Sequence, residues 1–126
     1  EDLPIRWIVD DAVKFLKREI NRGEKYDAII MDPPSYGKGP KGEVWKAETK
    51  LPEFLKICSE ALSTEPVFVI LNMYSTELSS LSLSNMLLDM MHGRGGTVTA
   101  GELAIKQEAS DKVLPMSIFS IWENVD

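Results

Sequence analysis

The chain has 126 residues, of which 44% are hydrophobic and 27% are charged. This is the length and composition of one globular domain with a single core, so two full domains are excluded. The net charge of −6 means that a nucleic acid would have to be contacted through a local basic patch. No apolar run approaches the roughly 18 residues of a membrane span, so we expect no membrane-spanning segment. The single cysteine excludes an intrachain disulfide and a multi-cysteine zinc site, and we expect a cytoplasmic protein.

The first part of the sequence alternates strand-like and helix-like segments. Residues 5–9 are short, β-branched and aromatic, which predicts a strand followed by two aspartates that can cap a helix. Apolar side chains at helical spacing then predict a helix over 11–22 that ends at Gly23. Residues 26–31 are typical of a buried strand inside a parallel sheet with helices on both faces.

The rest of the chain continues this alternation and closes with two adjacent strands. Residues 35–47 contain three glycines, a proline and three lysines without an apolar period, which predicts a long loop. The further elements that we expect are a helix over about 51–62 with Pro52 in its first turn, a strand over 67–73, a helix over about 80–92, and antiparallel strands over about 97–105 and 113–122. This order predicts a layered α/β sheet with right-handed crossovers, whose ligands bind beyond the carboxyl ends of the strands.

The sharpest motif follows the predicted strand over 26–31. Asp32, Pro33 and Pro34 come directly after it, and Tyr36 lies two residues further on. Consecutive prolines fix φ and lack N–H donors, so the backbone after Asp32 is stiff and its carbonyls can accept from a ligand. Such acceptors orient an exocyclic amine toward a methyl donor, and Tyr36 could stack on the base that carries the amine. The alternative is that the tripeptide only ends a strand and begins a turn.

The context of this motif resembles a known family. The segments RWIVDDA at 6–12, RGEKYDAIIMDPPSYG at 22–37 and GPKGEVWK at 39–46 are similar to the methyltransferase core of bacterial ribosomal-RNA methyltransferases. These are related to the large-subunit m5C and m7G enzymes, a class I group that depends on S-adenosylmethionine (SAM). The resemblance extends more loosely to Trp122. It implies a three-layer, Rossmann-like sheet, mostly parallel with a C-terminal antiparallel hairpin, of which this chain lacks the first two strands.

The resemblance also implies part of a cofactor site. Asp11, followed by the small Ala12, stands where the family's acid accepts a hydrogen bond from the adenine amino group of SAM, and Asp32 borders the same cofactor. The family's Gly-rich turn and its acid for the ribose hydroxyls have no counterpart upstream of residue 5. We therefore expect residues 1–126 to be the C-terminal part of a single methyltransferase domain that binds SAM weakly or not at all on its own.

The catalytic tetrapeptide of the family corresponds to Asp32, Pro33 and Pro34, with Ser35 at its fourth position and Tyr36 next to it. Many amino-group methyltransferases have an aromatic residue where Ser35 stands. This departure leaves the methylated atom open.

Basic and aromatic residues near this motif are candidates for substrate contacts. The loop lysines are expected to form a mobile cationic lip on substrate phosphates, with solvated lysines as the alternative. Trp45 is expected to be a substrate platform or a lid anchor, and Tyr74 to wall the target pocket or simply to pack. The candidate substrate contacts are Ser35, Lys38, Lys41, Trp45 and Tyr74, and we expect no metal site.

Cys58 limits the chemistry. Methylation of cytosine at C5 needs a thiolate at a strand end, but Cys58 shares an apolar helical stripe with Leu55 and Leu62, which predicts a buried structural thiol. We therefore expect chemistry other than cytosine C5 methylation. The resemblance implies methyl transfer from SAM to a nucleic-acid base of ribosomal RNA, with the RNA bound through the full-length protein. The alternative is a non-catalytic α/β binding or assembly module derived from a methyltransferase.

The missing strands also affect the sheet edge. In the family's sheet, two strands separate the strand over 5–9 from the strand over 26–31, so their removal exposes one edge of the latter. Such an edge is a template for pairing. We expect the chain to form a homodimer edge to edge, to swap its first strand, or to place that strand beside 26–31.

Overall fold

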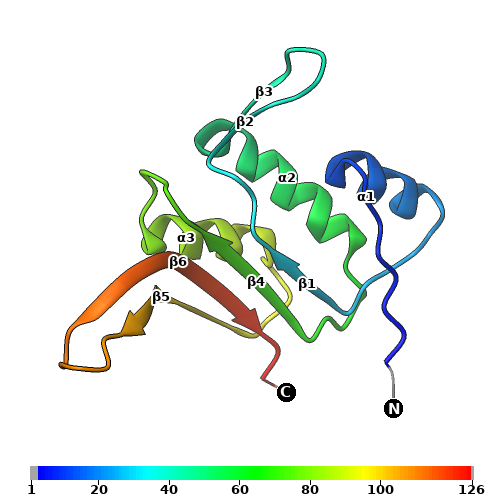
Figure 1. Cartoon of the computed structure of the whole chain (residues 1–126). Coiled ribbons are helices and arrows are strands. Elements are labelled where there is room, and N and C mark those ends of the chain that lie inside the picture. Colours follow the sequence, from blue (N-terminus) through cyan, green and yellow to red (C-terminus); the bar gives the residue numbers. More distant parts are fainter. Residues whose placement is uncertain (1–2, 126) are drawn as a thin grey trace.

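The computed structural model describes residues 3–125, which form a four-stranded sheet with three helices on one face and a small two-stranded hairpin (Figure 1). The elements in chain order are α1 (Ala12–Asn21), β1 (Ala28–Met31), β2 (Tyr36–Lys38), β3 (Val44–Lys46), α2 (Ala47–Ala61), β4 (Phe68–Met73), α3 (Ser80–Met90), β5 (Thr97–Lys106) and β6 (Val113–Glu123). The strand order of the main sheet is β1-β4-β6-β5. The predicted α/β class and the closing antiparallel hairpin are confirmed.

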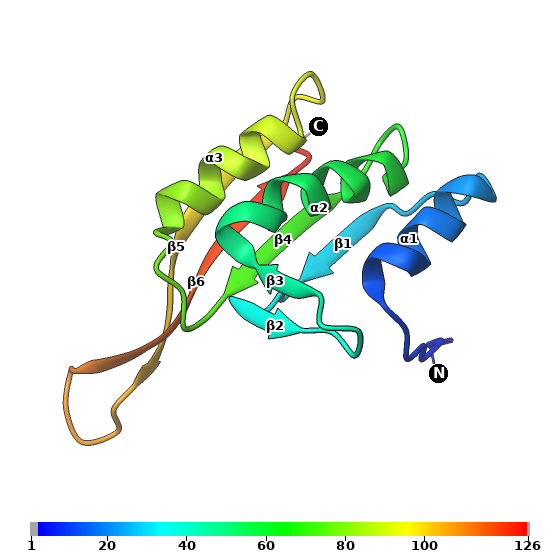
Figure 2. The same ribbon diagram turned by 90° about the horizontal axis from the view of Figure 1, so that it is seen from above.

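Two features of the predicted architecture are wrong for the described chain. Only β1 and β4 pair in parallel, whereas β4 with β6 and β5 with β6 are antiparallel, so the sheet is not mostly parallel. All three helices lie on the same face of the sheet (Figure 2), which gives two layers instead of three. Along β4, alternate residues are buried against the helices and partly exposed on the opposite face.

Residues 5–9 are not a strand, contrary to the prediction. This segment runs along the outside of the fold before α1 (Figure 1), and the Trp7 side chain is 86% exposed. An extended segment becomes a strand only when its backbone pairs with a neighbour. The predicted placement of residues 5–9 beside β1 is therefore also wrong, and β1 is an edge strand with Ile30 70% exposed.

The free edge of β1 predicts self-association. Pairing edge to edge, or a swapped first strand, would satisfy the backbone groups of Ala28–Met31 that no strand within residues 3–125 pairs on the outer side of β1. We expect the chain to form dimers whose fraction rises with protein concentration, and Ile30→Lys to shift it toward monomer because a charge on an edge strand opposes pairing. Light scattering after size exclusion measures this. A wild-type chain that stays monomeric at all concentrations contradicts the prediction.

The helices start and stop as their end residues dictate. The Asp11 side chain accepts from the backbone N–H of Lys14 at 2.9 Å and caps α1 as predicted. Gly23, with φ of 77°, follows the end of that helix. α2 begins at Ala47, several residues earlier than predicted, so Pro52 lies in its second turn and not in its first. The early start is fixed by the hydrogen bond from Ala47 N to Ser35 O at 3.0 Å.

The core lies between the helices and the inner face of β4. Every inward residue of β4 and the central apolar stripes of α2 and α3 are buried; they are Leu51, Leu55, Cys58, Val69, Leu71, Met73, Leu83 and Leu87. This core fixes β4 and, through parallel pairing, β1. The carboxyl ends of these two strands are thereby held side by side at one edge of the sheet.

The loop predicted over 35–47 contains the hairpin of β2 and β3. Gly39 N donates to Glu43 O at 2.8 Å across the turn, and Gly42 adopts a φ of 82° that favours glycine. The hairpin projects beside the carboxyl end of β1 (Figure 2). Within residues 3–125, no helix is long and apolar enough to cross a membrane.

A buried acid ties α1 to the segment before β1. The Tyr26 hydroxyl donates to Glu19 Oε2 at 2.5 Å, and Arg22 contacts Glu19 Oε1 at 3.2 Å. The hydrogen bond to the Glu19 carboxylate, helped by burial, raises the pKa of Tyr26 to about 12.

This raised pKa predicts a loss of stability in alkali. A folded-state pKa above the unfolded value of 10.0 contributes stability that is complete below that value and is lost as the pH rises through about 12. We expect the free energy of unfolding, measured in urea from neutral pH to alkaline pH, to fall in this window. Tyr26→Phe should lack this part of the fall and be less stable at neutral pH by about 1 kcal/mol. Parallel pH profiles in both proteins would contradict the assignment.

Candidate active site

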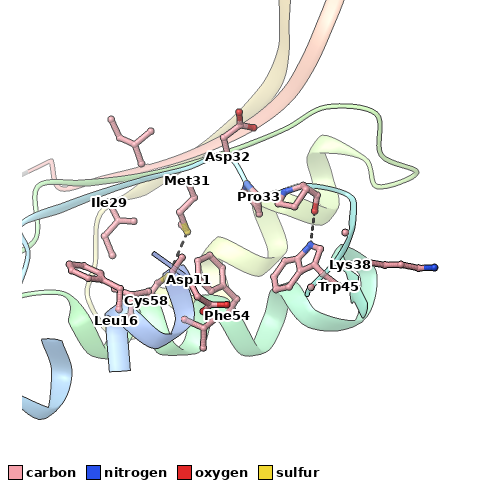
Figure 3. Close-up of a pocket in the computed structure, with 17 residues that line it drawn as sticks. Asp11, Leu16, Ile29, Met31, Asp32, Pro33, Lys38, Trp45, Phe54 and Cys58 are labelled. Atoms are coloured by element: carbon pink, nitrogen blue, oxygen red, sulfur yellow. Dashed lines mark hydrogen bonds between the residues drawn. The ribbon is translucent and has the colours of Figure 1, made fainter. Parts of the chain in front are cut away.

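The Asp-Pro-Pro turn lies at the carboxyl end of β1. Asn72, at the corresponding position of β4, donates from Nδ2 to Asp32 Oδ1 at 3.0 Å. The Asp32 side chain is exposed and Pro33 is buried. The Asp32 carboxylate points to the side of the strand opposite the Met31 and Cys58 sulfur atoms (Figure 3), because successive residues of an extended chain face opposite sides.

The Trp45 side chain forms a hydrogen bond with one of the two proline carbonyls. Its Nε1 donates to Pro34 O at 2.6 Å, and its ring meets the Phe54 ring edge to face at a centroid distance of 6.0 Å (Figure 3). The expectation that both carbonyls are open to a ligand is therefore wrong for Pro34. In the described part of the chain no donor is bonded to the Pro33 carbonyl. Trp45 thus anchors the hairpin to the turn.

Ser35 joins the ends of β1 and β4. Its hydroxyl donates to the Tyr74 carbonyl at 2.8 Å, so the structure uses Ser35 to hold the two strand-end loops together. Ser75, directly after Tyr74, has a φ of 49°, a left-handed conformation that is costly for a residue other than glycine. The Tyr74 ring remains 54% exposed on the outside of this junction.

A cavity of about 620 Å³ opens between α1, β1 and the hairpin. Its walls are mainly apolar and include Phe15, Leu16 and Ile29, while Asp11 and Ala12 from the start of α1 also line it (Figure 3). The structure brings the following predicted site residues to this cavity: Asp11, Ala12, Asp32, Pro33, Pro34, Lys38 and Trp45. Ser35, Tyr36, Lys41 and Tyr74 lie outside it.

The hairpin carries the predicted substrate contacts on its surface. Lys38, Lys41 and Lys46 are all exposed, and the Tyr36 side chain is 54% exposed at the start of β2. The Lys41 backbone N–H donates to the Glu43 carboxylate at 2.9 Å, which braces the turn. The hairpin therefore presents three cations and an aromatic ring next to the Asp-Pro-Pro turn.

Cys58 is a buried structural thiol, as predicted. Its Sγ lies 3.7 Å from Met31 Sδ in the core, and burial raises its pKa to about 12. A thiol in this state is not a nucleophile. Among residues 3–125, no group of three or more histidine, cysteine or acidic side chains is placed to hold a metal ion.

No family model and no curated protein matches the chain. Among solved structures, it is similar to the crystal structure of a SAM-dependent methyltransferase from Agrobacterium tumefaciens, with 44% sequence identity and a TM-score of 0.86 over 95% of this chain. The chain has a methyltransferase fold. It spans 40% of the length of that protein.

Two further solved structures share the fold at lower identity. One is SMU.776, described as a methyltransferase in complex with SAH, with 20% identity, a TM-score of 0.63, and coverage of 90% of this chain and 30% of the other. The second is described as a SAM-dependent methyltransferase from Streptococcus mutans, with 18% identity, a TM-score of 0.59 and the same coverage.

Asn72 and Ser117 are not among the site residues predicted from the sequence. Ser117 Oγ donates to Asn72 Oδ1 at 2.7 Å. The signal available in the sequence was a pair of serines, Ser117 and Ser120, among the mainly apolar residues of β6. Ser117 could not be paired with a partner 45 residues away.

Proposed function

We propose that this chain is the C-terminal part of a SAM-dependent methyltransferase domain that methylates a nucleic-acid base in cytoplasmic ribosomal RNA. The observation that carries the proposal is the acceptor pair at the end of β1. It consists of the Asp32 carboxylate, held by Asn72, and the Pro33 carbonyl, to which no described donor is bonded. This pair lies in a fold that the chain shares, at 44% identity, with a SAM-dependent methyltransferase.

The two acceptors suit an amino group on the substrate. The Asp32 carboxylate and the Pro33 carbonyl would each accept a hydrogen bond from one N–H group of the substrate amine. The lone pair of the amine nitrogen would then point away from both acceptors. SAM, when bound, supplies an electrophilic methyl group for in-line transfer to that lone pair. Because Pro33 and Pro34 fix φ and Trp45 holds the Pro34 carbonyl, the backbone that carries the Pro33 carbonyl is stiff.

The cavity fits the adenine end of SAM. Its apolar walls from α1 and β1 suit the faces of an adenine ring, and the Asp11 carboxylate at the start of α1 can accept from the adenine amino group. Ala12 adds little bulk beside it. Asp11 lines this space at the start of α1 and Pro33 lines it at the end of β1, so the adenine would lie on the α1 side and the methyl group near the end of β1.

The hairpin supports an RNA substrate in spite of the overall charge of −6. Lys38, Lys41 and Lys46 give a local cationic surface for phosphates, and Tyr36 offers a ring for stacking on an unpaired base. Trp45 acts as an anchor for this hairpin, while Ser35 fixes Tyr74 at the edge of the target site.

The proposal is tested by transfer of labelled methyl groups from SAM to purified ribosomal RNA by the longest polypeptide that contains this chain. Calorimetric titration of SAM into that polypeptide and into the 126-residue chain measures how much of the cofactor site each one holds. We expect transfer and binding by the longer protein and weak binding or none by the 126-residue chain. SAM binding without methyl transfer to RNA would favour a non-catalytic module derived from a methyltransferase.

The proposed contact between Asp11 and adenine predicts how substitution of Asp11 changes SAM binding. We expect Asp11→Ala to weaken SAM binding with little effect on turnover at saturating SAM, because the adenine contact is remote from the methyl group. Since Asp11 also caps α1, Asp11→Ala should cost about 1 kcal/mol of stability. Asp11→Ser keeps a capping oxygen, so weaker SAM binding in both variants separates the two roles. An unchanged dissociation constant for SAM counts against the assignment.

A further inference from the structure

A chain of side-chain hydrogen bonds crosses three neighbouring strands and ends at the proposed catalytic carboxylate. Ser117 Oγ on β6 donates to Asn72 Oδ1 on β4 at 2.7 Å, and Asn72 Nδ2 donates to Asp32 Oδ1 after β1 at 3.0 Å. We propose that Asn72 and Ser117 are positioning residues that fix the Asp32 carboxylate for methyl transfer. This inference rests on the proposed function.

Strand register places the three side chains on one face of the sheet. Met31 pairs with Leu71, so Asp32 continues the register opposite Asn72. Asn72 pairs with Phe119 across the β4–β6 ladder, and Ser117 lies two residues before Phe119 on the same face. This is the face opposite the helices, where Figure 3 shows the Asp32 carboxylate. The relay is therefore built by the sheet and does not depend on a flexible loop.

The direction of each hydrogen bond is fixed by chemistry. A carboxylate only accepts, so Asn72 must offer its NH₂ group to Asp32 and its carbonyl oxygen to Ser117. Ser117 donates to that oxygen and thereby opposes a flip of the amide. A flipped amide would place its oxygen against the Asp32 carboxylate, which would cost the hydrogen bond and add repulsion.

The relay leaves one carboxylate oxygen for the substrate. Asn72 bonds to Oδ1 of Asp32, and a carboxylate has a second oxygen, Oδ2, that can accept from the substrate. Asp32 is exposed, whereas Asn72 and Ser117 are half-buried. The two residues that hold the Asp32 carboxylate are therefore more constrained by packing than Asp32 itself. Without them, an exposed aspartate would exchange among its rotamers, and the acceptor pair would be misaligned for part of the time.

The kinetic test uses methyl transfer to ribosomal RNA by the longer polypeptide. We expect Asn72→Leu to lower kcat by about tenfold, with the dissociation constant for SAM unchanged. We expect Ser117→Ala to lower kcat by about threefold and Ser117→Thr to restore it. The double variant of Asp32→Ala with Asn72→Leu should be no slower than Asp32→Ala alone, because the two residues act as one unit.

Ser120, on the same strand as Ser117, provides a matched control variant. The Ser120 hydroxyl donates to the Thr99 backbone carbonyl at 3.2 Å and takes no part in the relay. Ser120→Ala should leave kcat unchanged, even where it lowers stability. If Asn72→Leu and Ser120→Ala have the same effect on kcat, the positioning role is overturned.

A measurement that needs no activity separates this inference from the proposed function. The side-chain amide signals of Asn72 in a nitrogen-15 NMR spectrum report its hydrogen bonds directly. We expect both Asp32→Ala and Ser117→Ala to shift these signals, and Ser120→Ala to leave them in place. If NMR shows the relay in the wild-type protein and Asn72→Leu nevertheless keeps a normal kcat, the inference alone is overturned. A wild-type protein that transfers no methyl group to RNA overturns the proposed function and the catalytic role together, and the NMR result still decides whether the relay holds Asp32.

Discussion

Asp32→Ala is expected to lower methyl transfer to ribosomal RNA by at least about tenfold while the fold stays intact. The substitution removes the carboxylate that would orient the substrate amine, and it leaves the Asn72 amide without its acceptor at the strand end. Because the Asp32 side chain is exposed, the loss of packing is small. The measurement is the initial rate of labelled methyl transfer at saturating SAM, together with the free energy of unfolding.

Asp89→Ala is the matched control for this change. Asp89 is an exposed aspartate in α3 near its C-terminus, where a negative charge opposes the helix dipole. Its replacement removes the same charge as Asp32→Ala and should leave the rate unchanged. Wild-type turnover in Asp32→Ala would remove Asp32 from the site, and an equal loss in both variants would indicate an effect of net charge.

The largest loss of stability is expected for Gly96→Ala. Gly96 has a φ of 74°, and a Cβ there would lie 2.6 Å from the Trp122 ring and 2.5 Å from the Glu123 carbonyl oxygen. Trp122 is 2% exposed and donates from Nε1 to Gly95 O at 2.8 Å, so it cannot move aside without breaking the core. We expect a loss of about 3 kcal/mol or more in the free energy of unfolding, measured in urea.

Gly93→Ala separates backbone strain from the clash. Gly93 has a similar φ of 80°, but nothing lies within 4 Å of a Cβ at that position. Gly93→Ala should therefore lower the free energy of unfolding by only about 1 kcal/mol, because alanine is strained in a left-handed conformation. If the two variants lose equal stability, the contact of Gly96 with Trp122 contributes nothing.

The elements that bury a regular apolar pattern could be predicted from the sequence. β4 is buried on alternate residues and α3 presents Leu83 and Leu87 to the core at helical spacing, so hydrophobic pattern and final structure agree. The Asp-Pro-Pro motif was located correctly at the end of β1 because a change from buried strand to consecutive prolines is visible locally.

The errors arose where structure depends on distant partners. The segment over 5–9 has the composition of a strand but no described strand to pair with, whereas the hairpin of β2 and β3 has no apolar period and is held by Trp45 on Pro34. The bonds of Ser35 to Tyr74 and of Asn72 to Asp32 join residues 39 and 40 positions apart. Local spacing carries no information on such pairs, so the links that organise the candidate site emerged only from the fold.

The hydrogen bond between Trp45 and Pro34 also allows the Asp-Pro-Pro turn to be followed by tryptophan fluorescence. The three tryptophans occupy different surroundings: Trp7 is exposed to solvent, Trp122 is buried, and Trp45 is half-buried with its indole N–H bonded to the turn. Indole emission depends on the polarity and hydrogen bonding around the ring, so a ligand that displaces the indole from Pro34 changes the Trp45 contribution. With Trp7 and Trp122 replaced by phenylalanine, the remaining fluorescence would be a spectroscopic report from the turn itself, read without a label and on the time scale of mixing.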